Sequence, residues 1–147
     1  MPGIRASELA ALLGLFPKNA KEFTSLDLAA AVVRGLPAGA LDGICTRVAP
    51  DDKSFRNKVV PKATFARRQR MRGQRLSAEE SDRVARLARL WAFAVDVWGS
   101  EAAAQRFFAE PHPLLGGRVP RDVAIQTEVG ARAVEDILGR LKYGSVA

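Results

Sequence analysis

One long helix with clear signals at both ends most constrains the fold of this chain. Ser77 and Glu80 form a capping box, in which each side chain can accept a hydrogen bond from the backbone amide of the other residue. Apolar residues then recur at three- and four-residue spacing, and Gly99 supplies a stop. The pattern predicts a helix over residues 78–98. Its single buried stripe comprises Val84, Leu87, Trp91, Ala94 or Val95, and Trp98.

Shorter helices are predicted along the rest of the chain, and no segment shows the alternation of a β-strand. The prolines and glycines of residues 111–117 predict an irregular loop instead. The fold class is therefore predicted to be all-α. The predicted helices other than the long one span residues 7–15, 25–33, 38–48, 53–58, 62–71, 101–109, 121–126 and 128–142.

Size and composition are those of an ordinary globular protein. The 147 residues suit one domain or two very small ones, and 48% are hydrophobic. No apolar run approaches the roughly 18 residues that a membrane span needs. Cys45 is the single cysteine, so a reducing cytoplasm is the expected compartment. Residues 1–24 are expected to form a flexible, loosely held segment.

Positive charge is concentrated in one block. Residues 51–75 contain nine Lys or Arg and two Asp, which equals the net charge of +7 of the whole chain. Short helices and a tight turn at Val60-Pro61 precede a basic helix here, which is the layout of a helix-turn-helix unit. The alternative is a solvated helix whose arginines pair with nearby acids. The residues expected to contact DNA are Lys62, Thr64, Arg67, Arg68, Arg70 and Arg72.

The residues that catalysis or metal binding would need are scarce. His112 is the single histidine and lies between two prolines, so a packing role in the loop is expected. Cys45 falls on the apolar side of a short helix and is expected in the core. Gly116-Gly117 lacks the strand and the Lys-Ser/Thr of a phosphate loop. We therefore predict a protein that is not an enzyme, with no metal and no cofactor.

Four segments in the last half of the chain carry a family resemblance. They are Arg75 to Ala88, Trp98-Gly99 with the short Ala-rich helix that follows, Leu114 to Pro120, and Thr127 to Ala131 leading to Leu141-Lys142-Tyr143-Gly144. In this order and spacing, they resemble the toxin-binding domain of the Xre/MbcA/ParS antitoxin family. The chain departs from the family at Phe107-Phe108, where Trp-Leu is frequent, at His112, where Asn is frequent, and at the less apolar stretch 121–124.

The resemblance implies the antitoxin of a type II toxin–antitoxin pair. The implied partner is a RES-domain toxin, which consumes NAD or transfers ADP-ribose, and the antitoxin would cover its active site. Residues 25–76 would be a helix-turn-helix-like DNA-binding portion, and residues 77–147 a toxin-binding portion with a C-terminal tail. The implied toxin-binding residues are Leu115, Gly116, Gly117, Arg118, Pro120, Arg140, Tyr143, Gly144, Val146 and Ala147.

The resemblance also implies regulation of the protein's own operon. A homodimer within a hetero-oligomeric complex is expected, because helix-turn-helix units usually bind two-fold symmetric operator DNA. The first helices or the Trp-bearing stripe would form its interface. The alternative hypothesis is a stand-alone helix-turn-helix repressor whose C-terminal half serves only for dimerisation.

Overall fold

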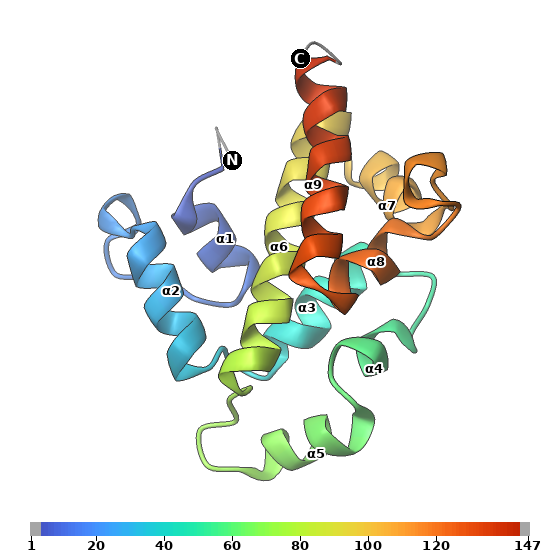
Figure 1. The fold of residues 1–147 in the computed structure, drawn as a ribbon. Coiled ribbons are helices and arrows are strands. Elements are labelled where there is room, and N and C mark those ends of the chain that lie inside the picture. The colour runs from blue at the N-terminus through green and yellow to red at the C-terminus, as the bar shows by residue number, and fades with distance from the viewer. Residues whose placement is uncertain (1–3, 145–147) are drawn as a thin grey trace.

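The predicted long helix, α6 (Ala78–Trp98), runs through the centre of the structure (Figure 1). The computed structural model describes residues 4–144. Within that range there is no β-strand, only two isolated bridges, so the all-α prediction is confirmed. No helix in the described range combines the length and apolarity that a bilayer span requires. The remaining elements are α1 (Ala6–Leu12), η1 (Ala20–Glu22), α2 (Ser25–Arg34), α3 (Gly39–Val48), α4 (Phe55–Val59), α5 (Lys62–Arg70), α7 (Glu101–Ala109), η2 (Pro113–Leu115), α8 (Pro120–Gln126) and α9 (Glu128–Tyr143).

Both predicted ends of α6 are present. The Ser77 hydroxyl accepts from the Glu80 amide at 3.1 Å, and the Glu80 carboxylate accepts from the Ser77 amide at 2.8 Å. Gly99 ends the helix at φ +75°, a conformation that costs glycine little. The buried stripe is shorter than predicted, because Trp98 remains 42% exposed. Trp98 is the last residue of the helix, and its ring centre lies 6.3 Å from that of Phe107.

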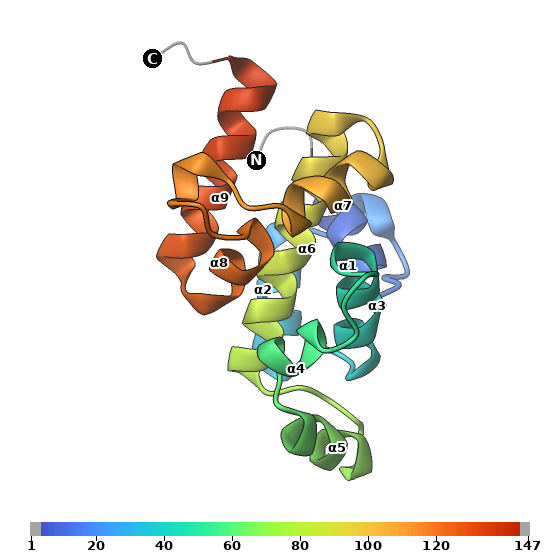
Figure 2. The same ribbon diagram turned by 90° about the vertical axis from the view of Figure 1, so that its right-hand side faces the viewer.

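The other helices surround α6 and share one hydrophobic core. In Figure 1, α1 and α2 lie on one side of α6, α7 and α8 on the other, and α9 runs parallel to α6 in front. The turned view in Figure 2 places α1 and α3 on the side away from α9. Buried side chains from Leu13 through Phe55 and Phe108 to Leu138 form a single cluster. The core is therefore continuous from the first helix to the last.

The N-terminal segment differs from the expectation of a loosely held chain. Ala10 and Leu13 have no exposed surface, and α1 packs on α2, α3 and α6. The reason is the short apolar run from Leu9 to Leu15, which covers core surface that α6 would otherwise expose. Thr24 caps the start of α2, in a second capping box with Asp27.

The two ends of the molecule carry different elements. Helices α4 and α5 lie at the end where α6 begins, and the C-terminal turns of α9 lie at the opposite end in both ribbon views (Figures 1 and 2). Four ion pairs keep α9 alongside α6 in this parallel arrangement. The pairs are Arg86–Glu128 at 3.1 Å, Arg89–Glu128 at 3.6 Å, Arg89–Glu135 at 3.5 Å and Lys142–Asp96 at 3.1 Å.

Candidate functional site

Helices α4 and α5 occupy the residues predicted to hold the helix-turn-helix unit. The turn contains only Val60 and Pro61, and proline suits this place because the first amides of a helix have no intrahelical acceptor. The buried side chains that anchor the unit to the core are Phe55, Val59, Val60 and Phe65. On α5 itself only Phe65 is buried, so one residue anchors this helix to the core while most of its side chains are half-buried or exposed.

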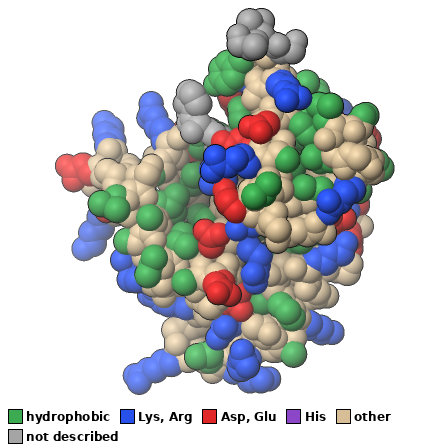
Figure 3. Space-filling model, viewed as in Figure 1, with side chains coloured by type: hydrophobic (Ala, Val, Ile, Leu, Met, Phe, Trp, Pro, Cys, Tyr) green, Lys and Arg blue, Asp and Glu red, His purple; other side chains and the backbone are tan. Residues whose placement is uncertain are grey.

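Most of the cations predicted to contact DNA lie on the outer side of the unit. The side chains of Lys62, Arg67, Arg70 and Arg72 are exposed, and within residues 4–144 none lies within 4 Å of a carboxylate. Thr64 is half-buried. Figure 3 shows Lys and Arg side chains gathered over this end of the molecule. The alternative of an internally neutralised helix therefore does not describe these four residues.

Arg68 lies differently from its neighbours. Its Nε and Nη2 atoms lie 3.0 and 3.3 Å from the two carboxylate oxygens of Glu80, and both side chains are largely buried. Burial opposes the ionisation of Glu80, but the hydrogen bonds from Arg68 and the Ser77 amide outweigh it and hold the pKa of this carboxyl below its usual value. Arg68 therefore ties α5 to the start of α6, and this placement does not favour the predicted phosphate contact.

The loop before α8 is held by its own backbone. The His112 carbonyl accepts from the Gly117 amide at 3.0 Å, and the His112 amide donates to the Arg118 carbonyl at 3.0 Å. Gly116 and Gly117 adopt φ of +65° and +81°, which other residues rarely do. The Nδ1 atom of His112 accepts from the Leu114 amide at 3.1 Å. The histidine thus has the loop-packing position expected for it.

The residues predicted to bind a toxin fall into two groups. In the loop, Gly116, Gly117 and Arg118 are exposed, Leu115 is half-buried, and Arg118 hydrogen-bonds to Gln126. Pro120 is buried as the first residue of α8, so its surface is not available to a partner. The second group, at the end of α9, comprises the exposed residues Arg140, Tyr143 and Gly144.

These two groups are not brought together at one point. Helix α9 extends past the loop in both ribbon views (Figures 1 and 2), so a partner touching both would cover the side of the molecule formed by α7, α8 and α9. Val146 and Ala147 lie outside the described residues.

A polar link between α8 and the helix-turn-helix unit was not predicted from the sequence. Arg121 is 8% exposed, and its two terminal nitrogens lie 2.8 and 3.2 Å from the carboxylate oxygens of Asp51. The Arg121 hydrogen bonds lower the pKa of Asp51. Lys58 and Asp122 form a second pair at 3.3 Å. No local pattern reveals these contacts, because the partners lie more than sixty residues apart.

Other groups able to do chemistry are few in the described range. No three His, Cys, Asp or Glu side chains between residues 4 and 144 gather as metal ligands would. Cys45 is buried in the core, as predicted, and burial together with the nearby Asp42 charge raises the pKa of its thiol to about 12.

Comparison with known proteins agrees with this architecture, an all-α protein in which a helix-turn-helix unit precedes a second helical portion. Residues 27–89 match the profile of the antitoxin Xre-like helix-turn-helix domain. Residues 93–144 match that of the antitoxin Xre/MbcA/ParS C-terminal toxin-binding domain. Over these two segments the chain resembles the antitoxins of the Xre/MbcA/ParS family.

Two curated relatives are similar over much of the chain. An Antitoxin Xre of Yersinia enterocolitica is 36% identical over 96 residues, which cover 65% of this chain and 64% of the relative. An Antitoxin Xre of Pseudomonas putida is 32% identical over 89 residues, which cover 60% of this chain and 55% of the relative. The chain thus spans less than two thirds of the length of either relative.

Proposed function

We propose that this chain is the antitoxin of a type II toxin–antitoxin system that also represses its own operon. The observation that carries the proposal is the division of the chain between two domain types, one matching a helix-turn-helix domain and one a toxin-binding domain. The two relatives that bear the name Antitoxin Xre support the same reading. The protein acts by binding and not by catalysis.

The toxin-binding surface would be the α8–α9 side of the molecule. At the end of α9, Tyr143 is 58% exposed and offers an aromatic ring, and Arg140 lies one turn earlier. Aromatic and arginine side chains often supply most of the energy of an interface. Gly144 at φ +80° lets the backbone approach a partner closely. The Leu115 to Arg118 loop would form the second part of the surface.

The proposed partner is a RES-domain toxin. Support for this class is the family resemblance, which extends over the loop and α9. In this proposal the C-terminal residues enter the cleft of the toxin that binds NAD and thereby exclude the substrate. A homodimer within a larger complex with the toxin is proposed, because a two-fold symmetric operator would be bound by two helix-turn-helix units.

Co-expression with the enzyme encoded in the adjacent gene tests the proposal that this chain neutralises a toxin. Growth and cellular NAD are measured with the parent chain, with a chain truncated before Tyr143, and with the variants Y143A and R140A. We expect the truncation and the two variants to weaken neutralisation.

Matched controls lie on the same helix. Val129, at the start of α9, is 79% exposed, and Arg132 is exposed nearby. V129A and R132A should neutralise the toxin as the parent does. Full neutralisation by the truncated chain would show that the tail is dispensable. Failure of the parent to co-purify with any such enzyme, with retention of operator DNA, would favour the stand-alone repressor.

A further inference from the structure

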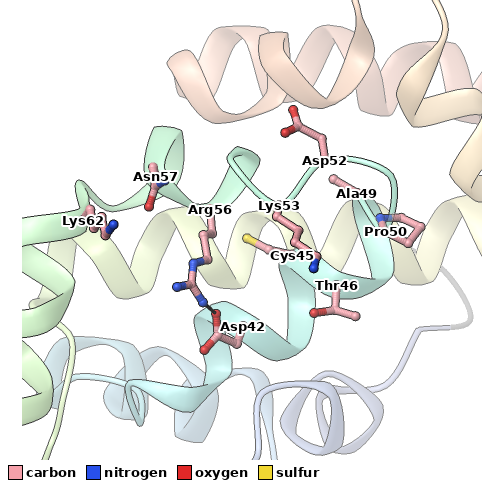
Figure 4. Close-up of a pocket in the computed structure, with 10 residues that line it drawn as sticks. All are labelled: Asp42, Cys45, Thr46, Ala49, Pro50, Asp52, Lys53, Arg56, Asn57 and Lys62. Atoms are coloured by element: carbon pink, nitrogen blue, oxygen red, sulfur yellow. Dashed lines mark hydrogen bonds and ion pairs between the residues drawn. The ribbon is translucent and has the colours of Figure 1, made fainter.

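A polar hollow lies next to the start of α5. It has a volume of about 450 Å³ and lies between α3, the loop that follows it, α4 and the first residue of α5 (Figure 4). Its charged and amide side chains are Asp42, Asp52, Lys53, Arg56, Asn57 and Lys62. Of these, only Lys62 belongs to the residues that the sequence assigned to DNA contact.

Both carboxylates of the hollow are already satisfied by protein groups. Asp42 is paired with Arg56, whose guanidinium also lies 5.7 Å from the centre of the Phe65 ring. Asp52 accepts hydrogen bonds from the amide and the hydroxyl of Ser54 at 3.0 and 2.6 Å, and Arg121 lies 3.9 Å away. The negative charge of the hollow is therefore offset from within the protein, and Arg56 is occupied as well.

Two lysines and one amide have no ion-pair or hydrogen-bond partner among residues 4–144. Within residues 4–144, neither Lys53 nor Lys62 lies within 4 Å of a carboxylate, and the side-chain amide of Asn57 makes no hydrogen bond to the protein. All three side chains are exposed. Figure 4 places Lys62 and Asn57 to one side of Arg56 and Lys53 to the other. The hollow thus presents separated hydrogen-bond donors and a net positive charge, which suits an anion.

We propose that this hollow receives the phosphate backbone of DNA beside the groove that α5 enters. Lys53 and Lys62 would contact phosphates and Asn57 would donate a hydrogen bond to a phosphate oxygen. A polymer suits the site better than a single small anion, because the cations do not converge on one point and continue along α5 as Arg67 and Arg70. The proposal rests on the DNA-binding part of the proposed function.

These contacts would set the position of α5 on the duplex. In a helix-turn-helix unit the first helix crosses the backbone while the second reads the groove. Asn57 belongs to the first helix of the unit, α4, and Lys62 to the second. Phosphate contacts fix the register without reading sequence, so the hollow would contribute affinity to any duplex and would not select among operators.

The test is the salt dependence of DNA binding by K53A, K62A and N57A. Fluorescence anisotropy is measured with a labelled duplex from upstream of the gene and with a scrambled duplex, over a series of KCl concentrations. Each lysine variant should reduce the log–log salt slope by about 0.9 on both duplexes. N57A removes no charge, so it should lower affinity about five-fold with the slope unchanged.

Lys58 provides the matched control. It lies next to Asn57 on α4, but its amine is paired with Asp122 at 3.3 Å, toward α8. K58A should bind both duplexes with the affinity and slope of the parent. Thermal melting of every variant checks whether these exposed substitutions leave the fold intact.

The outcomes separate this proposal from the function on which it rests. If R67A and R70A reduce the slope while K53A and N57A behave as the parent, DNA binding by α5 stands and the role of the hollow is overturned. A parent chain that binds neither duplex overturns both. If inorganic phosphate binds the parent but not K53A, while K53A binds both duplexes as the parent does, the hollow takes the free ion and the proposal is overturned.

Discussion

Arg68 on α5 and Glu80 on α6 form a two-point ion pair, with nitrogen–oxygen distances of 3.0 and 3.3 Å. Glu80 belongs at the same time to the capping box that starts α6. One carboxylate therefore stabilises the start of the central helix and orients the helix proposed to enter DNA. This makes Arg68 a positioning residue, distinct from the exposed arginines on either side of it along α5.

The variant R68A should lower DNA affinity without changing the salt slope. Glu80 already neutralises this cation, so its removal should not change the number of counterions released when DNA binds. It should also destabilise the fold by about 1–3 kcal/mol, because Glu80 stays buried with fewer partners. Urea denaturation and DNA titration over salt check both effects. R67A is the control and should do the opposite, reducing the slope by about 0.9 with little change in stability.

The depressed pKa of Glu80 predicts a specific pH dependence. A carboxyl whose pKa is lower in the folded state contributes stability above its unfolded-state pKa, and that contribution is lost as pH falls through the folded-state pKa. The free energy of unfolding of the parent should therefore decline below about pH 5. In E80Q this decline should be smaller, because the group no longer titrates. Parallel declines in parent and variant would contradict the assignment.

Gly130 and Gly139 lie on the same helix and should respond oppositely to alanine. A Cβ atom at Gly130 would lie 2.4 Å from the Val123 carbonyl oxygen, whereas one at Gly139 would meet nothing within 4 Å. G130A must separate α9 from α8 and should cost about 1–3 kcal/mol. G139A should stabilise the protein by about 0.5–1 kcal/mol, because alanine favours the helix. Equal effects in thermal melting would count against this packing.

The Arg121–Asp51 pair should be sensitive to which partner is removed. The Arg121 side chain is 10% exposed and that of Asp51 is 58% exposed, so only the arginine depends on its partner for neutralisation. D51N should destabilise the fold by about 1–2 kcal/mol, since it leaves a buried cation with Asp52 as the weaker partner. R121M replaces the cation by an apolar side chain of similar length and should be nearly neutral. Urea midpoints of the two variants give the comparison.

Cys45 should be unreactive in the native protein. Its thiol is buried and its pKa is raised to about 12, so the thiolate that reacts with disulfide reagents is scarce at pH 8. A thiol-specific reagent should modify it slowly in buffer and rapidly in urea. Rapid modification of the folded protein would mean that α3 opens easily at this position.

The positions of the helices could be predicted because their signals are local. Ser77, Gly99 and Pro61 are each recognised from their immediate neighbours, and each marks a helix end in the structure. The resemblance to the antitoxin family likewise followed from the order of short motifs, and both domain matches agree with it. Some helix ends differ by a few residues, since α4 begins at Phe55 and not at residue 53, and α1 ends at Leu12 and not at residue 15.

The contacts that depend on tertiary packing could not be predicted. From the sequence, Arg68 is one more cation of a basic helix, because nothing near it indicates that Glu80 approaches once the loop of residues 71–77 reverses the chain. The same holds for Arg121 and Asp51. The hollow at Lys53 and Asn57 was also not predicted. In the sequence its lysines look the same as Lys58, and only the folded structure shows that Lys58 pairs with Asp122 while they line the hollow.

The continuous helix α6 fixes how the two proposed binding surfaces are oriented relative to each other. The match to the helix-turn-helix domain ends at residue 89 and the match to the toxin-binding domain begins at residue 93, both inside this one helix of 21 residues. A hybrid with a relative would therefore have to be joined within a continuous helix. One residue inserted there would rotate one proposed surface by about 100° relative to the other, so only hybrids that keep the length of α6 would keep the two surfaces in their present relation.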